Sequence, residues 1–196
     1  MRSKSTRLVL FTRYPVAGQA KTRLIPAIGA PAAAEVHRKL TERTVKLLSL
    51  NEQPTEVQYT GGTIAQFESW LGTAIEFSEQ PDGDLSKKLL SAIDPSPVIF
   101  FGSDTPDLQA SHIEEAIEGL QNHDVVIGPA EDGGYYLIGI CQPYTYLFEN
   151  MPWSTEAVLD ETLARAKGNN LTVRLLETLS DCDRPEDLVR WPWLTE

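Results

Sequence analysis

The sequence predicts an α/β fold with a mostly parallel central sheet and helices on both faces. Segments typical of strands alternate with segments typical of helices along the 196 residues. Such alternation gives strand–helix–strand units, whose helices cover both faces of a parallel sheet. Residues 98–101, Val-Ile-Phe-Phe, are large and apolar without interruption, which is typical of a central strand buried on both faces. No low-complexity linker and no repeat interrupts the pattern, so we expect a single domain over residues 1–196.

The expected strands are short runs of apolar residues. They cover residues 8–11, 57–59, 75–77, 98–101, 125–127, 135–140 and 171–176. The first, Leu-Val-Leu-Phe, is apolar throughout, whereas the run at 57–59 gives a weaker signal. The stretch from 131 to 153 breaks the regular alternation. We therefore expect an antiparallel strand there, together with a loop that forms part of a site.

The expected helices are recognised by apolar spacing and by N-terminal capping residues. They cover residues 31–50, 64–71, 85–93, a segment starting at 111, residues 156–167 and a terminal segment after 183. Ser111 and Glu114 have the spacing of a capping box, which predicts that a helix begins there. Asp183 and Glu186 have the same spacing, so Asp183 is expected to cap the terminal helix.

The charge is distributed unevenly along the chain. The formal net charge is −11, yet residues 1–50 hold ten of the seventeen Lys and Arg and two of the twenty-eight acids. An acidic body argues against a general nucleic-acid binder, which needs a basic face. A basic N-terminal segment beside an acidic remainder instead suits a phosphorylated small molecule and a metal ion.

Nothing in the composition points to a membrane or to an oxidising compartment. No apolar stretch approaches the length of a membrane span, and the four apolar residues after the basic N-terminus are too few for a signal peptide. Cys141 and Cys182 have neither the spacing of metal ligands nor a disulfide framework. We expect a cytoplasmic protein with reduced thiols.

A carboxylate follows the expected central strand. Gly102 allows the chain to turn and Pro106 cannot continue a strand, so Asp104 is placed where the strand ends. Ligands of open α/β sheets bind at this edge. A carboxylate there is costly to desolvate unless a cation accompanies it, and a divalent metal is a common partner. The alternative is that Asp104 or Asp107 only caps the next turn.

A basic loop follows the first expected strand. Residues 12–24 include Arg13, Lys21 and Arg23, and a loop at this position can bind a phosphate through backbone N–H groups and cationic side chains. The glycines match neither a Walker loop nor a G-x-G-x-x-G fingerprint. We expect Lys21 and Arg23 to be exposed and to contact phosphates rather than to form ion pairs.

These segments belong to a series of six motifs that spans nearly the whole chain. The motifs are FTRYPVAGQAKTRL at 11–24, EQPDGDL at 79–85, GSDTPDL at 102–108, GPAEDGGYYLIG at 128–139, PWSTEAVL at 152–159 and SDCDRPEDL at 180–188. In this order they resemble the DUF2064 family of GT-A-type glycosyltransferases, whose members are labelled nucleotide-diphospho-sugar transferases. The resemblance implies a GT-A fold that binds a nucleotide.

The resemblance also implies roles for particular residues. Nucleotide phosphates would be bound by Arg13, Gly18, Lys21 and Arg23. The base would be recognised by Gln80, Gly83 and Asp84, although Gln80 and Asp84 could equally be turn and cap residues. Mg²⁺ or Mn²⁺ would be held by Asp104 and Asp183, and the capping role of Asp183 remains an equal alternative. The strict D-x-D spacing is absent, which leaves the role of Asp107 open.

The acidic turn at 131–134, Glu-Asp-Gly-Gly, has two interpretations. Asp-Gly is a strong hairpin-turn dipeptide. Two acids beside two glycines at the ligand edge also suit an acceptor pocket, in which a carboxylate takes a proton from a hydroxyl. We take Asp132 as the candidate base if transfer inverts the anomeric centre, with Glu131 in reserve.

The aromatic residues and histidines near these motifs add less. Trp153 could stack on an acceptor, but core packing is the commoner role of a single Trp. Tyr135 and Tyr136 would point to opposite faces of a strand, so at most one lines the site. The three histidines lie on expected helices or at their ends, away from the motifs, and we assign them no chemistry.

These inferences lead to a metal-dependent transfer of a sugar from a nucleotide-diphospho-sugar to a hydroxyl of a small molecule or a glycan. The alternative is a nucleotidyltransferase, which joins an NTP to a phosphorylated substrate and releases pyrophosphate. A third hypothesis is a nucleotide-sugar sensor without catalysis, which would have no need of a base such as Asp132. The sugar, the base, the acceptor, the stereochemistry and the oligomeric state stay open.

Overall fold

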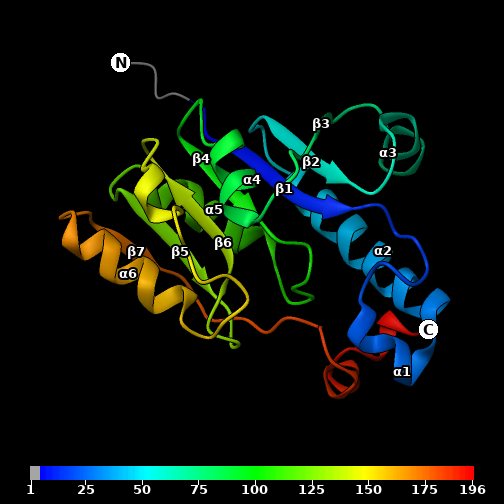
Figure 1. Cartoon of the computed structure of the whole chain (residues 1–196). Coiled ribbons are helices and arrows are strands. Elements are labelled where there is room, and N and C mark those ends of the chain that lie inside the picture. Colours follow the sequence, from blue (N-terminus) through cyan, green and yellow to red (C-terminus); the bar gives the residue numbers. More distant parts are fainter. Residues whose placement is uncertain (1–4) are drawn as a thin grey trace.

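A seven-stranded sheet forms the centre of the computed structural model, which describes residues 5–196 (Figure 1). The basic N-terminal residues Arg2 and Lys4 lie outside the described residues. The strands are β1 (Arg7–Arg13), β2 (Thr55–Thr60), β3 (Glu76–Glu79), β4 (Val98–Phe101), β5 (Val125–Pro129), β6 (Tyr135–Ile140) and β7 (Val173–Leu175). Their order in the sheet is β3-β2-β1-β4-β6-β5-β7. Strand β6 runs antiparallel to its neighbours β4 and β5, and the other pairs are parallel. The expected mostly parallel sheet and the antiparallel strand between 131 and 153 are confirmed.

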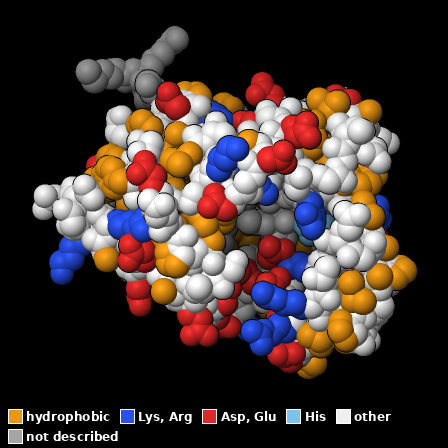
Figure 2. All heavy atoms as spheres, viewed as in Figure 1, with side chains coloured by type: hydrophobic (Ala, Val, Ile, Leu, Met, Phe, Trp, Pro, Cys, Tyr) orange, Lys and Arg blue, Asp and Glu red, His pale blue; other side chains and the backbone are white. Residues whose placement is uncertain are grey.

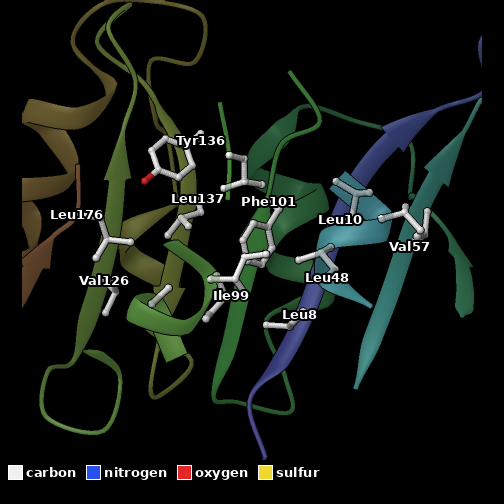
Figure 3. Close-up of a cluster of buried hydrophobic side chains, with 14 of the residues drawn as sticks. Leu8, Leu10, Leu48, Val57, Ile99, Phe101, Val126, Tyr136, Leu137 and Leu176 are labelled. Carbon is white, nitrogen blue, oxygen red and sulfur yellow. The ribbon is translucent and has the colours of Figure 1, made fainter. Parts of the chain in front are cut away.

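Helices cover both faces of this sheet. They are α1 (Ile25–Ile28), α2 (Ala30–Leu48), α3 (Ile64–Leu71), α4 (Leu85–Ala92), α5 (Ala110–Gly119) and α6 (Val158–Gly168), with short 3-10 turns η1 (Thr22–Leu24), η2 (Thr145–Leu147), η3 (Pro185–Arg190) and η4 (Pro192–Leu194). Helices α2, α3 and α5 pack on one face, in the core that Figure 3 shows. Helices α4 and α6 pack on the other face. None of the helices in residues 5–196 combines the length and the apolar character that a membrane crossing requires.

Strand β4 joins the two cores. Ile99 and Phe101 point into the core beneath α2 and α5, whereas Val98 and Phe100 point into the core beneath α4 and α6. All four side chains are at most 3% exposed. Alternate residues of a strand face opposite sides, which is why a central strand is apolar at every position. The expectation from residues 98–101 is therefore confirmed.

Two expected helix starts are wrong. Helix α5 begins at Ala110, because Gln109 takes the N-cap position and its backbone N–H donates to His112 Nδ1 at 3.1 Å. The terminal segment is a 3-10 turn whose N-cap is Arg184. Pro185 fixes the start of that turn, since proline is pre-organised for the first helical position. Asp187, not Asp183, is the capping carboxylate, and it accepts from the backbone N–H groups of 183 and 184 at 2.9 and 2.7 Å.

Candidate functional site

A cavity of 470 Å³ opens where β1 and β4 end. These strands are parallel neighbours, so the loops that follow them leave the sheet at the same edge. The cavity is lined from the first loop by Arg13, Lys21 and Arg23, and from the segment after β4 by Ser103 and Asp104. Acidic and basic side chains lie next to one another around a hollow on this face of the molecule (Figure 2).

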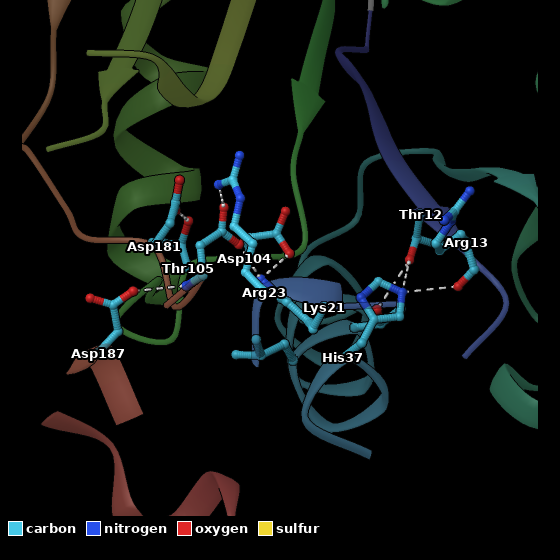
Figure 4. Close-up of polar contacts among 12 residues, drawn as sticks. Thr12, Arg13, Lys21, Arg23, His37, Asp104, Thr105, Asp181 and Asp187 are labelled. Atoms are coloured by element: carbon cyan, nitrogen blue, oxygen red, sulfur yellow. Dashed lines mark hydrogen bonds and ion pairs between the residues drawn. The ribbon is translucent and has the colours of Figure 1, made fainter. Parts of the chain in front are cut away.

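Lys21 lies between two carboxylates at the floor of this cavity. Its Nζ is 2.6 Å from Asp104 Oδ1 (Figure 4). The same Nζ is 2.8 Å from Asp183 Oδ1. Its side chain is only 5% exposed, so the expectation of an exposed Lys21 is wrong. The reason is tertiary: the backbone N–H of Cys182 donates to the Asp104 carbonyl at 2.9 Å, which brings the C-terminal segment to the end of β4. Arg23 is 65% exposed, as expected, but its Nη1 lies 3.3 Å from Asp183 Oδ2. The expectation that Lys21 and Arg23 form no ion pairs is therefore wrong.

The ion pair between Lys21 and Asp104 shifts the pKa of each of these two residues. Burial by itself would raise the pKa of Asp104, but the Lys21 ammonium outweighs it and lowers that pKa. Burial would likewise lower the pKa of Lys21, but Asp104 and Asp183 hold it above its ordinary value. The Lys21 ammonium and the Asp104 carboxylate therefore each favour the charged form of the other.

Asp104 and Asp183 fit one half of a metal site. Their Oδ1 atoms converge on a single cation, the Lys21 ammonium. Mg²⁺ commonly uses one or two protein carboxylates and completes its shell with water and substrate phosphates. In residues 5–196 no group of three or more His, Cys, Asp or Glu is arranged to hold a metal. A divalent ion bound between these two carboxylates would thus depend on a phosphorylated ligand for its other oxygens.

Asp107 takes no part in this pair. Its Oδ1 accepts a hydrogen bond from Trp191 Nε1 at 2.9 Å. Its carboxylate therefore anchors the C-terminal segment, a contact that the sequence motif does not show.

The residues expected near the base have different surroundings. Gln80 lines the cavity, and its Nε2 donates to the carbonyls of Thr12 and Gln58 at 3.0 and 2.6 Å. It thus ties together the ends of β1 and β2. Gly83 has a φ of 135°, and Asp84 caps α4 by accepting from the Lys87 backbone N–H at 3.0 Å. The cap interpretation of Asp84 is observed in the structure.

The remaining phosphate candidates shape the first loop. Gly18 has a φ of 86°, a left-handed conformation that glycine adopts at little cost. Arg13 Nη1 donates to the Gln19 carbonyl at 2.5 Å, which closes the loop on itself. One of the loop's own cationic side chains, Arg13, thus helps to hold the loop in shape.

His37 lines the same cavity, although the sequence analysis placed it away from any motif. It is buried on α2, and its Nε2 lies 3.0 Å from the Arg13 carbonyl and 3.3 Å from Thr12 Oγ1. Burial lowers the pKa of His37 despite the nearby Asp104 carboxylate, so the ring is neutral at pH 7. No sequence pattern predicts that His37 lies at the cavity, because only the packing of α2 across the end of β1 brings it there.

A second cavity, of 750 Å³, adjoins the first. Arg23 and Asp183 line both cavities. Glu131 and Asp132 line the second, at the turn between β5 and β6. The two expected parts of the site, the phosphate loop and the acidic turn, thus lie side by side.

The acidic turn is at once a tight hairpin and a cavity wall. Asp132 Oδ1 accepts from the Gly134 backbone N–H at 2.9 Å, which closes the turn. Gly133 has a φ of 86°, and a side chain there would collide with the Glu156 carbonyl oxygen. Glu131 Oε2 pairs with Arg190 Nη1 at 3.1 Å. The hairpin-turn interpretation is confirmed, and the same turn geometry presents Asp132 at the cavity. The acceptor-pocket interpretation stays a prediction.

The aromatic residues divide as expected. Tyr135 lines the second cavity, whereas Tyr136 Oη donates to the Glu177 carbonyl at 3.1 Å on the other side of the sheet. Trp153 both packs against the core and lines the cavity.

Asp181 is a site residue that the sequence analysis missed. It lines the second cavity, and its Oδ1 accepts from Thr105 Oγ1 at 2.5 Å. Burial and the Asp104 carboxylate raise its pKa to about 7. In an extended chain, residues i and i+2 lie on the same side. In the sequence SDCD, Asp181 and Asp183 have this spacing, which could have identified Asp181 as a partner of Asp183. Cys182 between them is fully buried in the structure.

Replacing Asp181 with Asn is expected to flatten the pH dependence of stability. The native pKa of about 7 lies above the ordinary 3.8, so the native state retains a proton that the unfolded state releases. The contribution of protonated Asp181 to the stability of the fold is present at low pH and is lost as the pH rises through about 7. Thermal unfolding in EDTA should show wild type losing several degrees more than Asp181→Asn between about pH 5 and about pH 8. Asp160→Asn, on the exposed side of α6, is the control for loss of one negative charge. Equal pH dependence in wild type and Asp181→Asn would contradict the prediction.

The family model described as "Uncharacterized protein conserved in bacteria (DUF2064)" matches residues 44–155. The chain belongs to the DUF2064 family. No curated protein matches this DUF2064 chain in sequence. Among solved structures, it is similar to a "putative nucleotide-diphospho-sugar transferase" from Desulfovibrio desulfuricans G20, with 27% identity and a TM-score of 0.88, over 97% of this chain and 88% of that one.

More distant structures share the fold. One is an inositol-1-phosphate CTP transferase from T. maritima, with 14% identity and a TM-score of 0.63, over 100% of this chain and 96% of that one. Another is a nucleotidyl transferase from Methanothermobacter thermautotrophicus, with 15% identity and a TM-score of 0.63, over 96% of each chain. The fold of the DUF2064 protein is thus that of nucleotide-diphospho-sugar transferases and their nucleotidyltransferase relatives, as expected.

Proposed function

We propose that this DUF2064 protein is a metal-dependent glycosyltransferase, which moves a sugar from a nucleotide-diphospho-sugar to a hydroxyl acceptor. The observation that carries the proposal is the pair of adjoining cavities, one beside the cationic loop and one beside the acidic turn, with Arg23 and Asp183 between them. A donor in the first cavity would place its sugar toward the second. The names of the similar structures support a transferase that uses nucleotides.

The first cavity suits a nucleoside diphosphate. Arg13 and Arg23 can each grip phosphate oxygens with two N–H groups, and Lys21 supplies a further charge. Asp104 and Asp183 would hold Mg²⁺ or Mn²⁺, and the ion would supply positive charge against the diphosphate of the donor. Because Lys21 now contacts both carboxylates, we expect its ammonium to move onto a phosphate when donor and metal bind. Of the three base candidates, Gln80 is in the lining of this cavity, and Gly83 and Asp84 are not.

The second cavity suits a hydroxyl acceptor. Asp132 can accept the proton of the attacking hydroxyl if the reaction inverts the anomeric centre. Glu131 is less suited to this role, because Ser180 and Arg190 lower its pKa and Arg190 pairs with its carboxylate.

A nucleotidyltransferase remains the second candidate, since several structures with the same fold are CTP transferases or nucleotidyl transferases. Incubation of the protein with a panel of nucleotide-sugars and Mn²⁺ tests the proposal through release of nucleoside diphosphate. A parallel panel of NTPs with sugar phosphates tests the alternative through release of pyrophosphate. Diphosphate release supports the proposal, and pyrophosphate release without it contradicts the proposal.

Asp104→Asn is expected to remove the metal dependence of nucleotide binding. The substitution keeps the shape of the side chain and deletes its negative charge. Calorimetric titration of the nucleoside diphosphate with Mn²⁺ should then give the affinity that wild type shows in EDTA. Asp107→Asn is the matched control, because its carboxylate binds Trp191 rather than Lys21. Unchanged metal dependence in folded Asp104→Asn would remove Asp104 as a ligand.

A further inference from the structure

We infer that the acceptor is a saccharide or polyol that is neutral or bears an amine, and that carries no phosphate or carboxylate. This inference rests on the proposed function, and it concerns the chemistry of the second cavity. Its volume of 750 Å³ is ample for a sugar ring or two. Its lining combines an apolar wall with an excess of carboxylates.

The carboxylates outnumber the cations in this lining. The acids are Glu131, Asp132, Glu156, Asp181, Asp183 and Asp187, and the basic residues are Arg23 and Arg184. Three of the acids have partners: Glu131 pairs with Arg190, Asp183 with Lys21 and Arg23, and Asp187 with two backbone N–H groups.

The other three acids, Asp132, Glu156 and Asp181, form no ion pair with a basic side chain of residues 5–196. Asp181 carries only part of a negative charge at neutral pH, because its pKa is raised to about 7. The lining is nevertheless acidic, since without Asp181 it still has five acidic side chains against Arg23 and Arg184. An anionic ligand would be repelled there, whereas hydroxyl and ammonium groups would find acceptors for their hydrogen bonds.

The apolar wall has a rigid aromatic ring. Trp153 Nε1 donates to Ser86 Oγ at 2.8 Å, and Ser86 in turn donates to the Phe148 carbonyl at 2.5 Å. The ring packs edge-on against Tyr135, with centroids 6.3 Å apart. The C–H face of a sugar ring can pack on such a surface while its hydroxyls reach the carboxylates.

The first cavity has the opposite character. Arg13, Lys21, Arg23 and Lys88 outnumber the two acids of its lining, Asp104 and Asp183, so phosphate groups are attracted there. The two cavities thus separate an anionic donor from a non-anionic acceptor. A nucleotidyltransferase would have to bring a sugar phosphate into the acidic cavity.

Binding of three matched probes tests the inference without any turnover. Glucosamine, glucose and glucose 6-phosphate differ mainly in charge, and the indole N–H signal of Trp153 in ¹⁵N-labelled protein reports on the second cavity. Trp153→Phe identifies that signal among the four tryptophans. We expect glucosamine to bind several-fold more tightly than glucose, and glucose 6-phosphate at least about tenfold more weakly than glucose at this site.

Charge variants supply the second arm of the test. Glu156→Gln should reduce the preference for glucosamine over glucose, and Asp160→Asn, which lies outside the cavity lining, should not. Glucose 6-phosphate moving the Trp153 signal with an affinity equal to that of glucose would overturn the inference. So would the absence of any Trp153 shift with glucosamine and glucose. Neither result bears on diphosphate release, so failure of this inference is distinct from failure of the proposed function.

Discussion

Asp132→Asn is expected to lower the rate of sugar transfer about a hundredfold or more, while donor affinity stays nearly unchanged. The amide keeps an oxygen that can accept from the Gly134 N–H, so the turn between β5 and β6 is retained. What it loses is the ability to take a proton from the acceptor hydroxyl. Release of nucleoside diphosphate in the presence of acceptor measures the rate, and calorimetry measures donor affinity.

The matched control is Glu131→Gln, whose carboxylate is already paired with Arg190. Its effect on turnover should be much smaller than that of Asp132→Asn. Diphosphate release that survives Asp132→Asn would remove Asp132 as the base and point to a retaining reaction. Pyrophosphate release that survives it would favour nucleotidyl transfer, in which the attacking phosphate oxygen is already ionised and needs no base.

Lys21→Met is expected to destabilise the fold and to weaken nucleotide binding by about tenfold or more. The substitution leaves two carboxylates facing each other without the ammonium between them. Removal of one partner of a fully buried pair costs about 3–5 kcal/mol. Asp104 and Asp183 are 44% and 39% exposed, so solvent screens part of their repulsion. We therefore expect a loss of about 1–2 kcal/mol in urea unfolding.

Two comparisons distinguish the role of Lys21 in the stability of the fold from its role in nucleotide binding. Arg23→Met removes a side chain that is 65% exposed, so it should weaken nucleotide binding but hardly change stability. Mg²⁺ should raise the melting temperature of Lys21→Met more than that of wild type, because a divalent cation can take the place of the ammonium between the carboxylates. A Lys21→Met protein as stable as wild type in EDTA would show that the ion pairs do not stabilise the fold.

Much of the architecture could be predicted because it depends on neighbours in the sequence. Apolar residues at every position of 98–101 require burial on both faces, and that alone makes β4 a central strand. The antiparallel β6 was visible because 131–153 lacks the helical spacing that a parallel crossover needs. Helix starts were less certain: Ser111 and Asp183 had the right spacing, but the side chains of His112 and Asp187 make the capping contacts. Several nearby side chains can compete for one cap, and spacing does not choose among them.

The sequence by itself determined the α/β class, the family, the basic loop after β1 and the acidic turn between β5 and β6. Only the tertiary structure decided that Lys21 lies between Asp104 and Asp183, that His37 lines the same cavity and that Asp181 lines the next one. The motifs follow from local backbone requirements and can be read along the chain. The contacts of Lys21 join residues up to 162 positions apart. They depend on the order of the strands in the sheet and on the return of the C-terminal segment to the end of β4, which no local pattern encodes.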